Sequence, residues 1–332
     1  MSAIVPATSA NVGCAFDCAA IALNLHLKAE FAPGGAGGFR ISYAGQNADR
    51  VPLDESNLVL LSFLRTLKHF GRTANGGEFA IESEIPVGVG LGSSAAAIVA
   101  GILLGTQLCK AEIDSRVVLR LALEMEGHPD NVTAAFHGGF VVAAAAGDPA
   151  EVLSCKAPVP SELDFIVVTP NVPIPTSEAR AILPKMYSRA DVVNNLQRAL
   201  LLAAQCFSGQ FDLTQEIFRD RLHQPYRSRL IPGLGACLEV EHPGLVGVFV
   251  SGAGSSVLAI ARQGADEIAE LLVETFRRKG VEAEKRLLKA DNRGAYLSRE
   301  AADAVGKPET DASSVTNRGD IRRKELIGKT RS

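Results

Sequence analysis

The chain has 332 residues, of which 47% are hydrophobic and 21% are charged, and its formal net charge is −3. This length suffices for a sizeable core in one large or two medium domains, and the composition excludes a disordered or fibrous protein. Acidic and basic residues are interspersed along the chain, so no extended positive field is available for nucleic acid or an anionic membrane, and neither partner is expected.

The sequence shows no pattern of a targeting segment, a membrane helix or paired cysteines. The N-terminal residues 1–6 lack a basic region followed by an apolar core, and no apolar stretch reaches the roughly 20 residues of a membrane helix. The six cysteines are scattered without a Cys-x-x-Cys pair, so free thiols are expected. We therefore expect a soluble, cytoplasmic protein.

The first half of the chain alternates between strand and helix patterns. It opens with a strand and a polar turn over residues 6–17. Further strands are predicted at 25–31, 39–43, 78–85 and 139–145, and helices at 58–70, 93–108 and 113–126. Ser56 or Asn57 is a candidate N-cap for the first helix. The second helix is apolar all round and is expected to be buried.

A looser pattern with several prolines at 146–161 suggests a connection between two domains, predicted at 1–155 and 156–303. The second half then reads as alternating strands (164–169, 247–251 and 282–289) and helices (176–207, interrupted near Pro184, then 213–222 and 265–279). From about residue 304 the chain is polar and charged, so residues 304–332 are expected to form a disordered tail.

The most informative motif is PVGVGLGSSAA at residues 86–96, a glycine loop that runs into a helix. Glycine allows positive φ and a close approach to a ligand, and the start of a helix offers free N–H groups to an anion. The run matches neither the dinucleotide fingerprint nor the Walker loop. It predicts a phosphate site, although a tight strand-to-helix turn would explain the same residues without a ligand.

A second cluster, EMEGHPDN at residues 124–131, ends a helix and is expected to enter a loop. Magnesium is usually bound by one or two protein oxygens together with phosphate oxygens and water molecules, so Glu124 and Ser94 could hold it. A solvated helix end is an equally good interpretation of this segment. His128 taken alone is better explained as a hydrogen-bonding residue than as a metal ligand.

Two further segments are polar and short. Residues 250–257 again combine a strand, a glycine turn and hydroxyls, although a simple hairpin or strand-to-helix turn is the more common explanation. In the N-terminal turn, Asn11 and Asp17 could bind the ammonium and hydroxyl groups of a small substrate. An Asx turn would account for both residues without any ligand.

Taken together and in this order, the three motifs resemble those of the GHMP small-molecule kinases. Residues 6–11 (PATSAN), 127–131 (GHPDN) and 251–254 (SGAG) are most similar to the homoserine kinase branch, and the likeness extends to about residue 290. The resemblance implies an α+β fold of two domains, the first like domain 2 of ribosomal protein S5 and the second ferredoxin-like. It also implies phosphorylation of the side-chain hydroxyl of L-homoserine by ATP with Mg²⁺, a step towards threonine.

The resemblance also assigns roles to residues. It places Asn57 near the adenine, and the nucleotide against Pro86, Gly88, Gly90, Leu91, Gly92, Ser93 and Ser94. It implies magnesium on Ser94 and Glu124, and catalytic roles for Asn131, Glu124, Ser94 and Arg180. It implies substrate contacts from Asn11, Asp17, His128, Asn131, Thr176, Arg180, Arg227 and Gly254. Two arginines suit a carboxylate, because each guanidinium can donate two parallel hydrogen bonds.

The chain departs from the family pattern where Cys14-Ala15 replaces Pro-Gly in the turn that aims Asp17. We expect Asn131 to orient the substrate hydroxyl while the γ-phosphate or a water accepts its proton, with Asp130 as the alternative base. Other readings are a kinase of the same fold acting on mevalonate or a sugar, and a nucleotide-binding regulator without turnover. A homodimer is also compatible with the resemblance.

Overall fold

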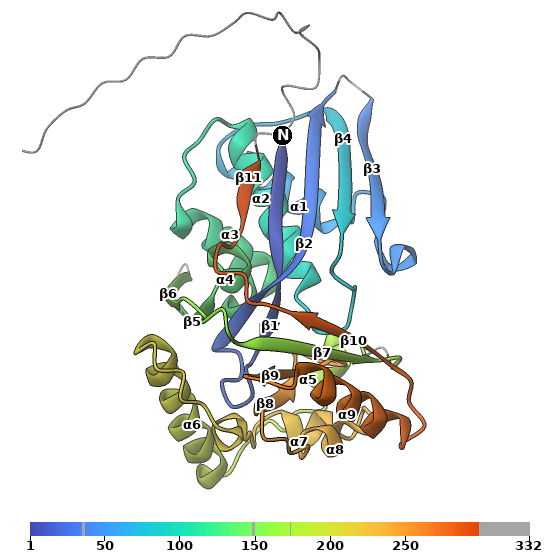
Figure 1. Cartoon of the computed structure of the whole chain (residues 1–332). Coiled ribbons are helices and arrows are strands. Elements are labelled where there is room, and N and C mark those ends of the chain that lie inside the picture. The colour runs from blue at the N-terminus through green and yellow to red at the C-terminus, as the bar shows by residue number, and fades with distance from the viewer. Residues whose placement is uncertain (35–36, 148–149, 173, 299–332) are drawn as a thin grey trace, which may run out of the picture. The chain divides into compact units, whose positions relative to one another are not determined.

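The structure is a computed structural model that describes residues 1–34, 37–147, 150–172 and 174–298 (Figure 1). The expected tail at 304–332 lies outside the described residues. Within the described part of the chain, no helix combines the length and the apolar character needed to cross a membrane.

Seven strands form the first sheet, in the order β11-β1-β2-β4-β3, with β5 and β6 attached beside β2. Their bounds are β1 (Ser2–Ala10), β2 (Ala19–Pro33), β3 (Gly38–Gly45), β4 (Gly76–Ser83), β5 (Phe140–Ala146), β6 (Glu151–Ala157) and β11 (Tyr296–Ser298). Only the pair β3–β4 is parallel among these strands. An irregularity between Pro6 and Ala7 shifts the β1–β2 register. The long strand β2 can therefore pair with β5 near its start and with β4 further along.

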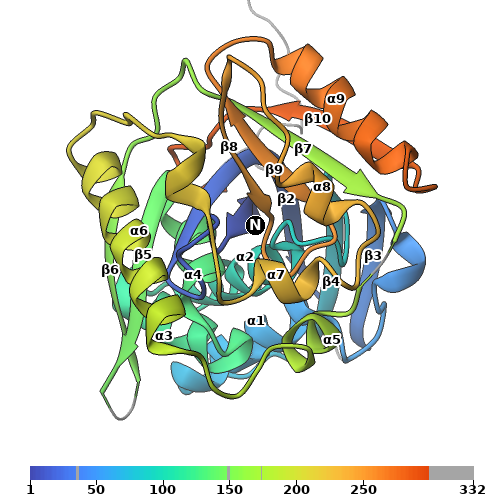
Figure 2. The ribbon, with the colours of Figure 1, turned by 90° about the horizontal axis from the view of Figure 1, so that it is seen from below.

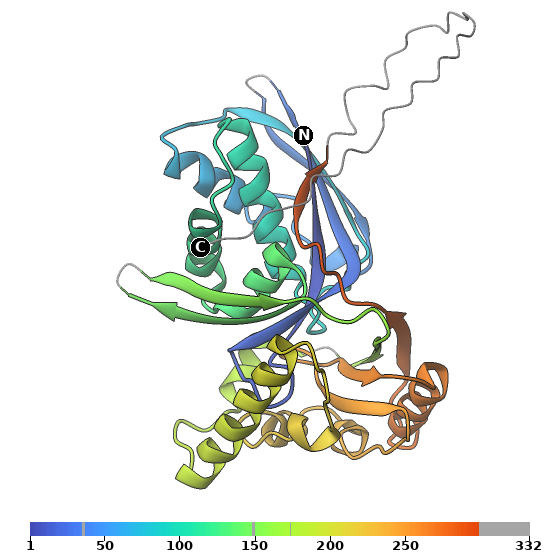
Figure 3. The ribbon, with the colours of Figure 1, turned by 60° about the vertical axis from the view of Figure 1, so that its left-hand side comes forward.

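Four helices cover one face of this sheet, as the side view shows (Figure 3). They are α1 (Leu58–His69), α2 (Ser93–Leu108), α3 (Ser115–Glu126) and α4 (Pro129–His137), and a short 3₁₀ turn η1 (Ala48–Arg50) precedes them. Helix α2 is buried over most of its length, as its apolar sequence predicts. The rings of Phe31, Phe63 and Phe79 pack with centroids 4.6 to 5.2 Å apart between α1 and the sheet. Truncating one such ring to alanine would cost about 3–5 kcal/mol.

The second sheet has four antiparallel strands in the order β10-β7-β9-β8. Its strands are β7 (Asp164–Pro170), β8 (Leu245–Val250), β9 (Val257–Ala261) and β10 (Ala283–Leu288). Its helices are α5 (Thr176–Ala181), α6 (Arg189–Phe207), α7 (Gln224–Arg227), α8 (Leu234–Cys237) and α9 (Ala265–Arg277), with a 3₁₀ turn η2 (Gln215–Phe218). Seen from below, α9 runs along β10 and β7 (Figure 2). The order strand, helices, two strands, helix, strand is that of a ferredoxin-like domain.

The chain returns to the first sheet after β10, because β11 pairs with β1. The turn before β11 is held by Asp291, whose carboxylate accepts hydrogen bonds from the backbone N–H groups of Arg293 and Gly294. Its other oxygen lies 2.8 Å from Nε2 of His26 on β2. A strand from the region predicted as the second domain therefore completes the first sheet, and the boundary at 155/156 stays a prediction.

Three segments differ from the sequence expectations. Residues 127–138, expected as a loop, contain α4, which starts with Pro129 at a position where proline needs no N–H partner. The connection expected at 146–161 contains β6, a mostly exposed edge strand paired with β5. The helix expected at 213–222 is only the turn η2, because the side chain of Gln215 bonds to backbone groups of Leu238 and Val248.

Candidate active site

The glycine loop joins β4 to the start of α2, and its backbone conformation explains its composition. Gly90 and Gly92 have φ of 87° and 68°. A Cβ on Gly90 would lie 2.1 Å from the carbonyl oxygen of Ser251, and one on Gly92 would lie 1.9 Å from Oγ1 of Thr8. Gly92 is the N-cap of α2, and no side chain caps that helix end. The loop therefore presents free N–H groups and the positive end of a helix dipole, as an anion requires.

Ser94 in the first turn of α2 meets a carboxylate, but not the one expected from the sequence. Its hydroxyl donates to Oε1 of Glu126 at 2.8 Å. Glu124 instead forms an ion pair with Arg65, and 36% of its side chain is exposed. The carboxylate beside Ser94 is therefore that of Glu126 and not that of Glu124, because two residues along a helix turn the side chain by about 200° to the opposite face, and a magnesium role for either residue stays a prediction.

Burial raises the pKa of Glu126, although the hydrogen bond from Ser94 and the positive charges of His128 and Arg180 oppose this effect. A carboxylate held in such a place would gain from a cation. The sequence contained a signal for the inward position of Glu126, because this residue continues the buried stripe of Leu119, Ala122 and Leu123 at helical spacing.

The start of α4 carries three polar residues with defined partners. Asp130 is buried, and its Oδ1 accepts from the Asn131 backbone N–H at 2.7 Å and contacts Nδ1 of His128 at 3.0 Å. Burial lowers the pKa of His128, but the hydrogen bond and charge of Asp130 outweigh it and raise that pKa above its ordinary value. The hydroxyl of Thr8 donates to Oδ1 of Asn131 at 2.7 Å, which leaves the Nδ2 donor of Asn131 for a ligand.

The N-terminal turn places Asp17 opposite a cation. Asn11, Val12 and Asp17 all have positive φ, an unfavourable conformation for residues with a side chain and most of all for valine. Oδ1 of Asn11 accepts from the backbone N–H of Asp17 at 2.9 Å. Arg180 in α5 donates two hydrogen bonds, of 2.9 and 3.0 Å, to the Asp17 carboxylate. The turn holds this geometry with Cys14 and Ala15 in place.

Arg227 is the most deeply buried cation of the site, with 1% of its surface exposed. It donates to the carbonyl oxygens of Ala179 and Gly252, and no carboxylate of the described residues lies within ion-pair distance of it. Burial, followed by the charge of Arg180, lowers the pKa of Arg227 to about 10. A buried cation without an anionic partner favours an anionic ligand.

The second glycine segment is a hairpin loop between β8 and β9 that braces the first glycine loop. The Ser251 hydroxyl contacts the carbonyl oxygen of Gly90 at 2.7 Å and the hydroxyl of Ser9 at 2.8 Å. Nδ2 of Asn11 donates to the carbonyl oxygen of Gly252 at 2.7 Å. Residues 250–257 thus form a hairpin, and the hydroxyl of Ser251 ties this hairpin to the first glycine loop.

These elements enclose one cavity of about 260 Å³. It is lined by Ala10, Asn11, Asp17, Leu58, Val87, Gly88, Gly90, Leu91, Gly92, Ser93, Ser94, Glu126, His128, Asp130, Asn131, Thr176, Arg180, Arg227, Gly252 and Ala253. Most of the residues expected at the nucleotide and substrate sites are therefore brought together. Leu58, Val87 and Ala253 belong to the lining but carry no chemical signal in the sequence.

Besides Glu124, three expected residues are absent from the lining of this cavity. Asn57 caps α1, with its Oδ1 accepting from Val59 and its Nδ2 donating to Pro52, and it lines a neighbouring cavity of about 110 Å³. Pro86 lines a third cavity. Gly254 is absent from the lining of the main cavity, where Gly252 and Ala253 take its place. The amide of Asn57 is hydrogen-bonded within the protein through both its oxygen and its nitrogen, and its expected place near the adenine stays a prediction.

Comparison with known proteins finds two family models that match separate parts of the chain. The family model described as the GHMP kinases N terminal domain matches residues 57–139, and that of the GHMP kinases C terminal region matches residues 199–278. A homoserine kinase of Solibacter usitatus is 37% identical over 295 residues, which cover 89% of this chain and 96% of that protein. The chain belongs to the GHMP kinase family.

Other relatives of this GHMP kinase agree. A homoserine kinase of Nostoc punctiforme is 39% identical over 88% of the chain and 96% of its own length. The crystal structure of homoserine kinase from Cytophaga hutchinsonii superposes with a TM-score of 0.77 at 30% identity, covering 89% and 96% of the two chains. A mevalonate kinase structure at 15% identity, with a TM-score of 0.55, shares the fold alone. The expected α+β fold of two domains is confirmed.

Proposed function

We propose that this GHMP kinase transfers the γ-phosphoryl group of ATP to the side-chain hydroxyl of L-homoserine. One observation carries the proposal: a glycine loop at a helix start and a buried arginine, with no carboxylate partner among the described residues, open into the same cavity of about 260 Å³. In the reaction the hydroxyl oxygen forms a bond to phosphorus, the bond to the bridging oxygen of ADP breaks, and the hydroxyl proton is released. Relatives of this chain at 37% and 39% identity carry the name homoserine kinase.

The charges of the cavity complement a small amino acid. Homoserine has a carboxylate, an ammonium and a hydroxyl group. Arg227 offers a buried guanidinium, and the Asp17 carboxylate forms an ion pair with Arg180 that an incoming zwitterion can share. The substrate carboxylate would bind the two guanidinium groups while its ammonium group binds Asp17, so the buried charge of Arg227 would gain an anionic partner.

The residues at the start of α2 fit a nucleotide and its magnesium ion. The Ser94 hydroxyl and the Glu126 carboxylate, 2.8 Å apart, are hard oxygen donors beside the glycine loop. When bound, Mg²⁺ neutralises charge on the phosphate oxygens. The contributions of the chain itself are to place the phosphates on the loop amides and to hold the hydroxyl in line with them.

Asn131 is the residue placed to orient the hydroxyl. Because its Oδ1 is occupied by Thr8, its Nδ2 would donate to the hydroxyl oxygen, which leaves the hydroxyl proton free to pass to a phosphate oxygen or a water. Asp130 lines the same cavity and is the alternative base. Asn131→Ala is expected to lower kcat about 100-fold, with Asp130→Asn affecting it less. A larger loss in Asp130→Asn would favour a carboxylate base.

An ADP-release assay with ATP, Mg²⁺ and L-homoserine tests the proposal, with mevalonate and galactose as competing alcohols. Ser94→Ala is expected to lose most of the activity, whereas the control Ser154→Ala, an exposed hydroxyl on β6, should keep it. Tight ATP binding without homoserine-dependent ADP release would indicate a nucleotide-binding regulator. A higher kcat/KM with another alcohol would indicate a different substrate.

A further inference from the structure

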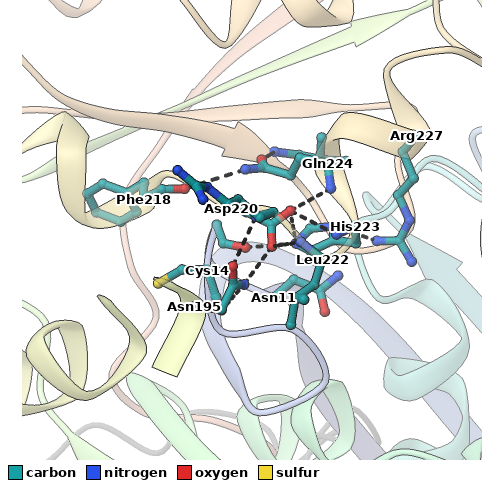
Figure 4. A network of polar contacts seen from close by, with 12 residues as sticks. Asn11, Cys14, Asn195, Phe218, Asp220, Leu222, His223, Gln224 and Arg227 are labelled. Atoms are coloured by element: carbon teal, nitrogen blue, oxygen red, sulfur yellow. Dashed lines mark hydrogen bonds and ion pairs between the residues drawn. The ribbon is translucent and has the colours of Figure 1, made fainter. Parts of the chain in front are cut away.

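A buried polar network lies behind the wall of the active-site cavity, between the N-terminal turn and α7 (Figure 4). Its centre is His223, whose side chain is completely buried. One ring nitrogen, Nε2, lies 2.7 Å from the carbonyl oxygen of Gly13 in the N-terminal turn. The other, Nδ1, lies 3.1 Å from Nη1 of Arg227. The histidine therefore bridges the turn that carries Asp17 and the arginine of the substrate pocket.

These two partners fix the protonation of the imidazole. A guanidinium can only donate, so Nδ1 facing Arg227 must be an acceptor without a proton. A carbonyl oxygen can only accept, so Nε2 facing Gly13 must carry the proton. His223 is thus a neutral imidazole in a single tautomer, and a second proton would break its contact with Arg227.

Arg227 is held from three sides by this arrangement. Its Nε donates to the Ala179 carbonyl oxygen at 3.2 Å, and its Nη1 donates to both the Gly252 carbonyl oxygen at 2.9 Å and His223. Nη2 is then the nitrogen that remains for a ligand in the cavity that Arg227 lines. The ring of Phe16 also stacks on His223 at 5.1 Å and faces the Arg227 guanidinium at 5.4 Å.

Asp220 fixes the turn from which His223 and Arg227 project. Its carboxylate accepts from the backbone N–H groups of Leu222, His223 and Gln224 at 2.6 to 3.0 Å. Nδ2 of Asn195 donates to the same carboxylate at 2.7 Å. With both oxygens satisfied by these donors, Asp220 has no need of a proton from the imidazole, whose Nε2 lies 3.7 Å away.

We propose that His223 is a positioning residue for substrate binding: as a neutral Nε2–H imidazole it links the Gly13 carbonyl to Arg227 and holds the guanidinium against the pocket that receives the carboxylate. This inference rests on the proposed function, because it assigns Arg227 to the substrate. His223 does not line the cavity, and Arg227 is the lining residue to which its ring is hydrogen-bonded. It acts on the substrate through that arginine.

Burial and the charge of Arg227 favour the neutral state of the imidazole, whereas two nearby carboxylates oppose it. Arg227 faces Nδ1, Asp220 lies beside Nε2, and Asp17 contributes its charge from the N-terminal turn. Burial, the largest effect, lowers the pKa of His223, and Arg227 lowers it further against the opposing charges of Asp220 and Asp17. The neutral form should therefore persist at a pH below the ordinary histidine value of 6.5.

Two substitutions separate the two contacts of the ring. In His223→Gln the longer side chain can place an amide N–H near the Nε2 position and keep the contact to Gly13, but it removes the acceptor for Arg227. In His223→Asn the shorter side chain can place an oxygen near the Nδ1 position and keep that acceptor. His69→Gln, at the exposed end of α1, is the matched control.

The expected result is a rise in the KM for homoserine of about tenfold or more in His223→Gln, with a smaller rise in His223→Asn and none in His69→Gln. The KM for ATP should stay within about twofold in all three variants. A homoserine KM unchanged in folded His223→Gln, or an ATP KM raised equally, would overturn the assignment, because a merely structural role would affect both substrates.

Nitrogen NMR of the wild-type protein without ligands tests the tautomer independently of any variant's folding. One histidine, assigned by its loss in either His223 variant, should show a protonated Nε2 and an unprotonated Nδ1 from pH 7.5 down to about pH 5.5. A doubly protonated ring or the opposite tautomer at pH 7 would refute the proposal. If wild-type protein releases no ADP with homoserine, the proposed function fails, and the NMR result still decides whether His223 holds Arg227.

Discussion

The proposed magnesium role of Glu126, in place of Glu124, leads to the sharpest prediction. In Glu126→Gln the amide keeps the size of the side chain and can still accept the hydrogen bond of Ser94, but the negative charge is lost. Removing one positioned electrostatic contact from a site where charge develops costs about 2.7–4 kcal/mol, which corresponds to a loss of about 100- to 1,000-fold in kcat. Glu124→Gln is the matched control, because it removes only a partly exposed ion pair with Arg65. Such pairs contribute about 0–1 kcal/mol.

The stability of Glu126→Gln should not fall with its activity. Burial raises the pKa of Glu126, so its ionised form is disfavoured in the folded protein without a cation. A neutral amide removes that cost, and Glu126→Gln is expected to unfold at the same or a higher temperature than the wild type in the absence of nucleotide. A residue that lowers stability while supporting activity is typical of a functional site.

The assay combines steady-state ADP release over a range of Mg²⁺ concentrations with thermal unfolding of the ligand-free protein. Glu126→Gln should show both the lower kcat and a higher half-saturating Mg²⁺ concentration, and Glu124→Gln should show neither. The reasoning would be refuted if Glu126→Gln kept more than about a tenth of the wild-type kcat. A loss in Glu124→Gln equal to that in Glu126→Gln would refute it as well.

Three further predictions follow from single contacts. Arg227→Lys should raise the homoserine KM about tenfold with little change in the ATP KM, because one ammonium group cannot keep the bonds to Ala179, Gly252 and His223 and also donate to the substrate, and an unchanged KM would remove Arg227 from the site. Gly92→Ala should lower kcat/KM for ATP about 100-fold or more, because its Cβ would lie 1.9 Å from Oγ1 of Thr8. The control Gly88→Ala, whose Cβ meets nothing closer than 3.8 Å, should show a smaller loss of kcat/KM. Asp291→Asn should lower the free energy of unfolding at pH 7 by about 1–2 kcal/mol in urea titrations. Burial raises the pKa of Asp291, but the imidazole on β2 and two backbone N–H groups lower it more, to below 3.8. The ionised carboxylate therefore stabilises the folded protein above that pH. The difference in free energy of unfolding between variant and wild type should shrink as the pH falls below about 4.

Local sequence signals accounted for the elements that a short stretch of chain can specify. Helix α2 begins at Ser93 and ends at Leu108 as expected, because a glycine with positive φ precedes a continuous stretch of alanine and aliphatic residues that is buried against the rest of the protein. Helix α1 begins after Asn57, whose side chain caps it as predicted. Helix α4 was missed because its glycines and proline at either end are also the residues of a loop.

For the functional site as well, local sequence signals indicated some features and not others. Glycine spacing and the hydroxyl of Ser94 indicated an anion site, since those properties belong to the residues themselves. The choice between Glu124 and Glu126 depended on which face of α3 is buried, which the apolar stripe of that helix could have suggested. The burial of Arg227 and its bond to His223 had no local signal.

By itself the sequence determined where most helices and strands form and that a phosphate-binding loop is present, because backbone preferences and apolar spacing act over a few residues. Only the tertiary structure decided which side chains share the cavity. The Gly13 carbonyl and His223 are separated by 210 residues, and Asn11 and Gly252 by 241. Contacts at such separations depend on how both sheets and their connecting loops pack, and that information is spread over the whole chain.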